Sequence, residues 1–246
     1  MRYLAFPSLS FPGLSHGVFT RHGGVSDQPF HSLNIGYHVG DEPDNIVENR
    51  ALIKQALGLK TMISAKQVHG DRVLVVTAQP DDDYEVDGYD ALVTNCCTGL
   101  MVQQADCQAV MLFDPVQRVA GIVHSGWRGS VTDIIGKTVK TMFQAFGSRA
   151  SDLCAAISPS LGPCCGEFVN FREELPASMH DYQVRDDYFD FWSISRDQLQ
   201  TAGVGADRIE IAGNCTVCDE DFFSYRRDRQ TGRFASVIGL VNGRFK

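Results

Sequence analysis

The feature that most constrains the fold is the segment AVMLFDPVQRVAGIVH, residues 109–124, in which two short apolar runs flank Asp114-Pro115. Apolar runs of this length with a turn dipeptide between them predict a strand, a turn and a second strand. The second run ends at His124, and the small-residue turn SGWRG follows at once. A strand that delivers an imidazole to such a turn predicts the edge of a pocket.

Helical and strand patterns are interspersed along the rest of the chain, without a regular β-α-β rhythm. Apolar positions at helical spacing predict helices over residues 44–59, 130–147 and 191–203, the second with Phe143 on its buried face. Short apolar runs predict strands over residues 72–77, 91–95, 208–213 and 235–242. With no repeat and no low-complexity linker, the sequence predicts one mixed α/β domain over residues 1–246 rather than a doubly wound fold.

Charge and apolar content exclude two classes of partner. The 246 residues carry a formal net charge of −8, which repels a phosphate backbone, so we expect no nucleic-acid partner. One basic cluster, SYRRDRQTGR at residues 224–233, is sufficient to hold a single small anion. No apolar run approaches the roughly 20 residues that cross a bilayer, and Pro7 and Pro12 argue against a signal peptide. We therefore expect a cytoplasmic protein with no membrane partner.

Eight cysteines are present, and in a cytoplasmic chain of this size we expect free thiols or metal ligands. Cys215 and Cys218 form a CxxC motif. The motif lacks the thioredoxin-like context of a redox site. A zinc ribbon needs a second matched pair, which the adjacent Cys164 and Cys165 do not supply. The sequence therefore predicts structural thiols at Cys215 and Cys218.

Three candidate metal ligands stand at the ends of apolar or turn segments: His69, Cys107 and His124. Zinc accepts imidazole nitrogen and thiolate sulfur, and a catalytic zinc keeps three protein ligands and one open position. A shared site would leave that position for water or substrate and lower the pKa of bound water to about 7. The long, irregular spacing leaves a second interpretation open, in which the histidines are satisfied core residues and the cysteine is a small apolar side chain.

Seven short motifs occur in a fixed order along the chain. They are TRHGGVS at residues 20–26, LNIGYHVGD at 33–41, QVHG at 67–70, DALVTN at 90–95, ADC at 105–107, HSGWRG at 124–129 and FFSYRRDRQTGR at 222–233. Each is weak alone, but the ordered set resembles the bacterial YfiH-type, or laccase-domain, family, also called purine nucleoside phosphorylase-like. The resemblance runs from Thr20 to the C-terminus.

The resemblance implies a fold, a metal and an activity. It implies a layered α/β sandwich with mixed sheets and one zinc ion held by His69, Cys107 and His124, with copper as an older assignment. It implies phosphorolysis of purine nucleosides such as adenosine, inosine and methylthioadenosine, with adenosine deamination in some members. A peptidoglycan-precursor amidase activity is also attached to some members. The chain departs from the family pattern at Ala109, Ser125 and Asn214, none of them a metal ligand.

Five polar residues of these motifs are candidates for contact with the substrate. Arg21 and Arg128 are expected to bind phosphate, because a guanidinium pairs with phosphate through two hydrogen bonds. Asn34 and Gln67 are expected to hydrogen-bond the sugar or the base. Asp106, next to the cysteine ligand, is a candidate catalytic proton shuttle or, equally, the partner of a ligating histidine. Turn formation and surface solvation are the competing interpretation for all five.

Three alternatives stay open. A copper-dependent polyphenol oxidase would use the same three ligands with an axial Met101 or Met111, but seven histidines without an HxH pair cannot supply its trinuclear cluster. In a cysteine hydrolase, Cys107 would be the nucleophile and His124 its base. In a structural zinc site a fourth protein ligand would close the coordination, and His38 is the candidate.

Overall fold

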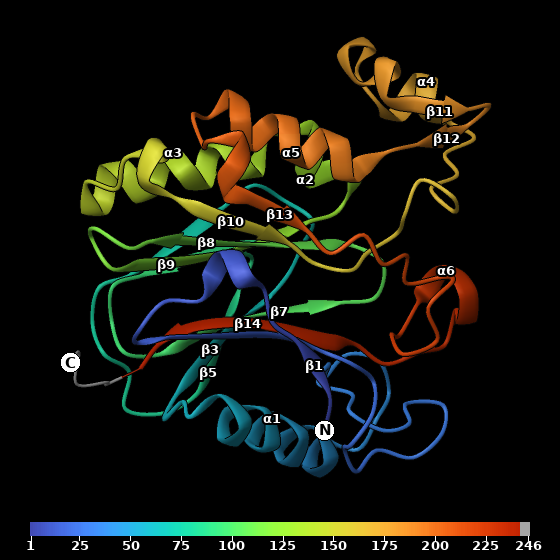
Figure 1. The fold of residues 1–246 in the computed structure, drawn as a ribbon. Helices are drawn as coiled ribbons and strands as arrows, with labels where there is room; N and C mark the ends of the chain where they lie inside the picture. Colours follow the sequence, from blue (N-terminus) through green and yellow to red (C-terminus); the bar gives the residue numbers. More distant parts are fainter. Residues whose placement is uncertain (242–246) are drawn as a thin grey trace.

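The computed structural model describes residues 1–241, and two six-stranded sheets packed as layers form its centre (Figure 1). The first sheet has the strand order β1 (Tyr3–Leu4), β2 (Leu14–Phe19), β14 (Phe234–Leu240), β7 (Gly99–Gln104), β3 (Met62–Lys66) and β5 (Tyr84–Asp87). The second sheet has the order β13 (Ile209–Ile211), β10 (Cys154–Ile157), β8 (Gln108–Asp114), β9 (Val119–Ser125), β6 (Ala91–Thr94) and β4 (Val73–Val76). A separate small hairpin pairs β11 (Gln183–Arg185) with β12 (Tyr188–Phe189).

Helices cover the outer faces of both sheets. The helix α1 (Pro43–Leu57) lies against the first sheet, whereas α2 (Trp127–Val131), α3 (Ile134–Phe146) and α5 (Phe191–Thr201) lie over the second (Figure 1). The shorter helical segments are α4 (Phe171–Glu174), α6 (Tyr225–Asp228), η1 (Pro7–Leu9), η2 (Ala150–Asp152), η3 (Ala177–Tyr182) and η4 (Ala206–Arg208). This layering confirms the predicted single-domain α/β sandwich with mixed sheets. Residues 242–246 lie outside the described residues, so the predicted domain end at residue 246 stays a prediction.

Both sheets mix parallel and antiparallel pairs. The strand β3 runs parallel to β5 and β7, β10 runs parallel to β13, and β4 runs parallel to β6. The strands β8 and β9 form the antiparallel unit that the sequence predicts, with Ala109 opposite His124. This register matters most for function, because it fixes which residues meet where the two strands leave the sheet.

Alternation along the central strands divides the core into layers. In β8, Met111 and Phe113 pack between the two sheets, whereas Val110 and Leu112 pack with α3 and α5. In β9, Ile122 points between the sheets in the same way. Strands covered on both faces need near-continuous apolar sequence. The apolar runs of residues 109–124 therefore belong to the centre of the molecule.

The predicted helix over residues 130–147 is wrong as a single element. The helices α2 and α3 are separate because Asp133 takes a left-handed conformation with φ of 52°, which an α-helix cannot continue. Its carboxylate accepts a hydrogen bond from the Gly136 amide at 3.1 Å and caps the start of α3. Phe143, expected on the buried face, is 59% exposed.

The other predicted helices and strands are present with small shifts at their ends, as α1, α5, β4, β6, β13 and β14. Position 242, the last of the strand predicted over residues 235–242, lies outside the described residues. The strands β2, β3, β5, β7 and β10 have no counterpart in the prediction, because they are short or interrupted by polar and small residues. Within residues 1–241, no helix combines the length and the apolar character that crossing a bilayer requires.

Replacement of Ile122 by alanine is expected to lower the free energy of unfolding by about 2–5 kcal/mol, because the buried side chain leaves a cavity between the sheets. Val116→Ala, at a residue 65% exposed in the β8–β9 turn, is the matched control and should change it by less than about 0.5 kcal/mol. Urea denaturation followed by circular dichroism measures both. Equal midpoints for the two variants would contradict this place for Ile122 in the core.

Candidate metal centre

Strand register brings Cys107 and His124 together. Ala109 of β8 lies opposite His124 of β9, and Cys107 immediately precedes β8. His69 comes from the loop between β3 and β4. The ligand atoms of the three side chains lie within 4.8 Å of one another, with Nε2 of His69 3.9 Å from Sγ of Cys107. The two imidazole rings meet edge to face, their centroids 4.9 Å apart. The fold thus gathers the three residues that the sequence offers as metal ligands.

One buried carboxylate, that of Asp90, fixes the loop that carries His69. Oδ1 of Asp90 accepts a hydrogen bond from the backbone N–H of His69 at 2.9 Å. Its Oδ2 accepts from the N–H groups of Gly70 at 2.8 Å and Val68 at 3.3 Å. His69 has a φ of 57°, a left-handed conformation that few non-glycine residues adopt. The three hydrogen bonds hold the backbone in that conformation and so place the imidazole.

The same carboxylate orients His124. Oδ1 of Asp90 lies 2.9 Å from Nδ1 of His124, and the His124 amide donates to the Asp90 carbonyl at 2.7 Å. The pairing of β6 with β9, which sets Ala91 opposite Val123, fixes this arrangement. The bond to Nδ1 leaves Nε2 to face Cys107. Carboxylates set the tautomer and orientation of metal-binding histidines in this way.

The electrostatics of the cluster favour a thiolate. Burial raises the pKa of the Cys107 thiol, but hydrogen bonds and charges from His124 and His69 outweigh burial and bring that pKa down to about 6. Burial lowers the pKa of His124, but Asp90 and Cys107 outweigh it and raise the pKa to about 9. Burial raises the pKa of Asp90, and hydrogen bonds from His124 and backbone amides reverse this and leave it lowered. The thiolate is the form of cysteine that binds metals and acts as a nucleophile.

Gly126 allows the three side chains to approach one another. A Cβ at this position would lie 3.1 Å from Sγ of Cys107 and 3.1 Å from Cδ2 of His69. Both distances are shorter than the roughly 3.5–4.0 Å of favourable carbon contacts. The φ of Gly126 is −81°, so close approach rather than backbone freedom favours glycine here. This explains why a small-residue turn follows His124.

The donor set fits a catalytic zinc ion. With bonds of about 2.1 Å to nitrogen and about 2.3 Å to sulfur, a tetrahedral zinc site has a sulfur–nitrogen edge of about 3.6 Å. The distance between Cys107 and His69 is 3.9 Å, close to that edge. Among residues 1–241, no fourth His, Cys, Asp or Glu joins the group. His38, the candidate fourth ligand, lines the nearby cavity with its Nε2 3.9 Å from Oε1 of Glu85.

The three ligands border a cavity of about 520 Å³, within the range of about 300–1,000 Å³ typical of small-molecule sites. Its aromatic wall comprises Trp127, Phe168, Phe191 and Tyr225. The polar and charged side chains of its lining include Gln67, Gln103, Asp106, Arg226 and Arg233. The aromatic faces suit a planar base, and the guanidinium groups beside them suit an anion.

Of the two residues expected to bind sugar or base, Gln67 lines the cavity and Asn34 lies outside the lining. The Gln67 amide donates to the carbonyl of Gln103 at 2.9 Å and accepts from its N–H at 2.8 Å. Asn34 is fully buried, and its Oδ1 accepts from the N–H groups of Gly36 and Arg233 at 3.1 and 2.8 Å. Both amides therefore support the wall of the cavity through backbone contacts.

The two arginines expected to bind phosphate also lie outside the lining that the structure describes. The guanidinium of Arg21 stacks over the ring of Phe223 at 4.5 Å. Arg128 is exposed on the short helix α2. Arg226 and Arg233 line the cavity instead, and both belong to the basic cluster in which the sequence indicates room for a small anion.

Asp106 lines the cavity, but hydrogen bonds occupy its carboxylate. Oδ1 accepts from the hydroxyl groups of Thr216 and Ser224, each at 2.7 Å, and Oδ2 accepts from the N–H of Arg226 at 2.6 Å. These contacts tie the loop before β8 to the segment that carries α6. A proton-shuttle role for Asp106 stays a prediction. Its other expected role, as partner of a ligating histidine, stays a prediction too, and the partner of the His124 ring is Asp90.

Asp90 is the residue that sequence reasoning misses. It stands in the DALVTN motif, one residue before a predicted strand, where a polar side chain often faces a site. Its position in the sequence does not, however, indicate that its partner is His124. The partner follows only from the pairing of β6 with β9, which joins segments about 30 residues apart.

Comparison with known proteins agrees with the ordered motifs. A family model described as multi-copper polyphenol oxidoreductase laccase matches residues 15–241. The chain belongs to this laccase-like family. Relatives named YfiH and YlmD confirm the resemblance to the YfiH-type proteins.

Two of these relatives and one solved structure show how closely the family matches. Purine nucleoside phosphorylase YlmD of Geobacillus stearothermophilus is 34% identical over 249 residues, which cover 93% of this chain and 91% of that protein. Purine nucleoside phosphorylase YfiH of Shigella flexneri is 35% identical over 252 residues, which cover 98% and 100%. The crystal structure of YlmD from Geobacillus stearothermophilus matches with a TM-score of 0.87 at 31% identity, covering 98% of this chain and 97% of that one.

Asp90→Asn is expected to weaken zinc binding at this centre by about 10–100-fold, because the carboxylate fixes both histidine ligands. Competition with a chromophoric chelator measures the affinity, and His69→Ala identifies which binding step belongs to this centre. Asp81→Asn, at an exposed carboxylate before β5, is the matched control and should leave the affinity unchanged. Equal affinities in the Asp90 and Asp81 variants would remove Asp90 from this role.

Proposed function

We propose that this chain is a zinc-dependent purine nucleoside phosphorylase that cleaves adenosine, inosine and methylthioadenosine with phosphate. The observation that carries the proposal is the three-ligand group bordering a cavity with an aromatic wall and two arginines. The relatives YlmD and YfiH bear the name purine nucleoside phosphorylase. The proposed partners are small molecules, a nucleoside and phosphate, and the proposed location is the cytoplasm.

Phosphorolysis needs an anion held in line with the glycosidic carbon, and Arg233 is the residue proposed to hold it. Its Nη1 donates to the carbonyls of Thr231 and Gly232 at 3.1 and 3.0 Å, which fixes the half-buried guanidinium. Burial lowers the pKa of Arg233 by more than the charges of Cys107 and Asp106 raise it, so the pKa is lowered overall. A guanidinium nevertheless stays protonated in proteins. The edge formed by Nε and Nη2 would pair with two phosphate oxygens.

The aromatic wall is proposed to hold the purine. Phe168 and Phe191 pack against each other with ring centroids 4.9 Å apart, and Trp127 packs in the same apolar cluster. Rings held by their neighbours offer a fixed face to a planar base, and such stacking contributes about 1–3 kcal/mol per base. Gln67, held by the backbone of Gln103, adds a rigid polar edge on the lining.

A zinc ion held by His69, Cys107 and His124 would supply a Lewis acid for a substrate oxygen or a bound water of lowered pKa. Asp90 keeps the two histidines oriented. Asp106 is the residue proposed to carry a proton to the departing purine. Adenosine deamination is proposed as a secondary activity. Zinc deaminases use a glutamate as acid and base, and since the described lining of the cavity holds no glutamate, Asp106 would take that part as well.

Zinc fits this chain better than the copper of a polyphenol oxidase. Met101 packs in the core beside α1 and Met111 packs between the sheets, so neither is among the described residues that line the cavity. Within residues 1–241, a single histidine-containing group has the arrangement of a metal site. A trinuclear copper cluster requires many more histidines than this group offers.

A cysteine hydrolase is the second candidate, and one observation favours it. Cys107, His124 and Asp90 place a thiol of pKa about 6, an imidazole and a carboxylate in series. This series activates nucleophiles in unrelated hydrolases. Here the thiolate would attack an amide, such as one in a peptidoglycan precursor, and His124 would act as base and acid. A metal ion would block the reaction, because it would occupy the thiolate.

Removal of the metal separates the two candidates. With phosphate and adenosine, inosine or methylthioadenosine, the protein is expected to release free base and a sugar 1-phosphate, at rates that fall at least about tenfold on chelation and return with Zn²⁺. Chromatography of the products measures this, and Cys107→Ala is the inactive control. Amide hydrolysis that needs Cys107 and survives chelation would favour the hydrolase. Base release no greater than that of the control would overturn the phosphorylase.

Arg233→Gln is expected to raise the KM for phosphate by about 10–100-fold, since a hydrogen bond to a charged group contributes about 1.5–3 kcal/mol. The KM for the nucleoside should change less, and thermal melting checks that the variant is folded. Arg128→Gln, at the exposed arginine of α2, is the matched control and should leave both constants unchanged. The opposite pattern would return the phosphate site to Arg128.

A further inference from the structure

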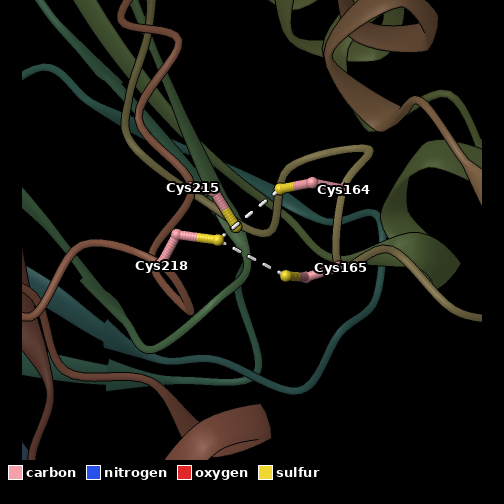
Figure 2. A group of neighbouring side chains, drawn as sticks. All are labelled: Cys164, Cys165, Cys215 and Cys218. Atoms are coloured by element: carbon pink, nitrogen blue, oxygen red, sulfur yellow. Dashed lines mark hydrogen bonds between the residues drawn. The ribbon is translucent and has the colours of Figure 1, made fainter.

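Four cysteines from two distant loops meet in space. Cys164 and Cys165 follow β10, and Cys215 and Cys218 follow β13. All four sulfur atoms lie within 4.8 Å of one another, and Figure 2 shows the side chains turned toward a common point. The structure thus matches the CxxC motif with the adjacent cysteine pair. From the sequence alone that pair offers no match, and the prediction of structural thiols at Cys215 and Cys218 stays a prediction.

Parallel strand pairing causes this meeting. The strands β10 and β13 are parallel neighbours, with Ala155 opposite Ile209, so both chains leave the sheet in the same direction. The pairing continues past the strands. The N–H of Ser160 donates to the carbonyl of Asn214 at 3.1 Å, and the N–H of Thr216 donates to the carbonyl of Ser160 at 3.0 Å. The two cysteine-bearing loops are therefore held side by side by backbone hydrogen bonds.

The sulfur–sulfur distances suit a metal ion rather than a disulfide. Sγ of Cys218 lies 3.7 Å from Sγ of Cys164 and 3.6 Å from Sγ of Cys165. A disulfide bond is about 2.05 Å long. A tetrahedron of sulfurs around zinc, with bonds of about 2.3 Å, has edges of about 3.8 Å. The two measured distances are close to those edges.

Backbone contacts hold the cluster in this arrangement. The N–H of Gly162 donates to Sγ of Cys215 at 3.3 Å, and the N–H of Cys218 donates to the carbonyl of Cys215 at 3.1 Å and closes the CxxC turn. A Cβ on Gly162 would lie 2.9 Å from Cβ of Cys215, so only glycine lets the two loops come this close. The sulfur of Cys215 is thus buried and fixed from both loops.

Three guanidinium groups contact the backbone of the two cysteine-bearing loops. Nη2 of Arg185 donates to the carbonyl of Cys164 at 2.9 Å, and Nη1 of Arg226 donates to that of Cys165 at 3.3 Å. Nη1 of Arg227 donates to a carbonyl inside the CxxC turn at 2.8 Å. Four thiolates around a divalent cation carry a net charge of −2, and neighbouring guanidinium groups stabilise such a charge.

We propose that Cys164, Cys165, Cys215 and Cys218 bind a second zinc ion in a closed four-sulfur site. Soft thiolate ligands in a tetrahedron are typical of structural zinc, which has no open coordination position. Binding forms four zinc–sulfur bonds and releases to water the proton of each thiol that was protonated beforehand.

This second ion would stabilise the part of the cavity lining that includes Asp106 and Arg226. Thr216 lies between Cys215 and Cys218, and its hydroxyl donates to Asp106. The segment continues to Arg226, which lines the cavity and donates its N–H to Asp106. The site is therefore a positioning device for the loop before β8. It does not depend on the proposed phosphorylase activity, since it rests on the four sulfurs and their surroundings alone.

Elemental analysis of the purified full chain tests the proposal. The natural sequence is expected to hold about two zinc ions per chain, and Cys215→Ser/Cys218→Ser about one. Cys107→Ala, which removes a ligand of the first centre, is expected to keep about one, with four sulfur neighbours at about 2.3 Å in its zinc X-ray absorption spectrum. Cys96→Ser, at a half-buried cysteine outside both groups, is the matched control and should keep both ions.

The opposing outcomes are distinct. A single zinc ion that disappears in Cys107→Ala would overturn the four-sulfur site and leave the first centre intact. Iron in place of zinc, or a disulfide from Cys218 to Cys164 or Cys165 found by mass spectrometry of unreduced protein, would also overturn it. If the double variant fails to fold, the absorption spectrum of Cys107→Ala decides the matter alone, because it reports on the remaining ion directly.

Discussion

A single buried carboxylate holds the candidate metal centre together. The Asp90 carboxylate accepts hydrogen bonds from backbone N–H groups of the His69 loop and is also hydrogen-bonded to Nδ1 of His124. One side chain therefore sets the positions of two ligands. Removing a carboxylate from water is costly, and here the hydrogen bonds that it accepts replace its hydration. Since Asp90 stands where β6 begins beside the end of β9, the geometry of the centre depends on sheet pairing more than on the loops themselves.

The centre lies where the chain crosses from one sheet to the other. His69 belongs to the connection from β3 in the first sheet to β4 in the second, and Cys107 belongs to the connection from β7 to β8. The core between the sheets, which includes Ile63, Leu100 and Met111, sets the separation of the two layers. Because protein interiors are close-packed, apolar contacts far from the ligands control how near the two crossings come to each other.

Local features of the site can be predicted from the sequence, and its tertiary pairings cannot. The apolar runs of residues 109–124 predict the two strands whose register brings Cys107 to His124, and the ordered motifs identify the family. Asp90 and the two cysteine pairs acquire partners only when β6 is known to join β9 and β10 to join β13. Arg128 shows that closeness along the chain does not fix where a side chain lies. It follows His124 closely along the chain, yet the short helix α2 presents it to solvent.

The strand β14, Phe234–Leu240, sits inside the first sheet, between β2 and β7. During synthesis one edge of β2 therefore stays unpaired until residue 240 has left the ribosome. An open strand edge recruits other chains, and pairings between such distant segments form slowly. The first sheet can therefore close only after β14 has been synthesised, and the strand edge that is open until then is of the kind that chaperones shield.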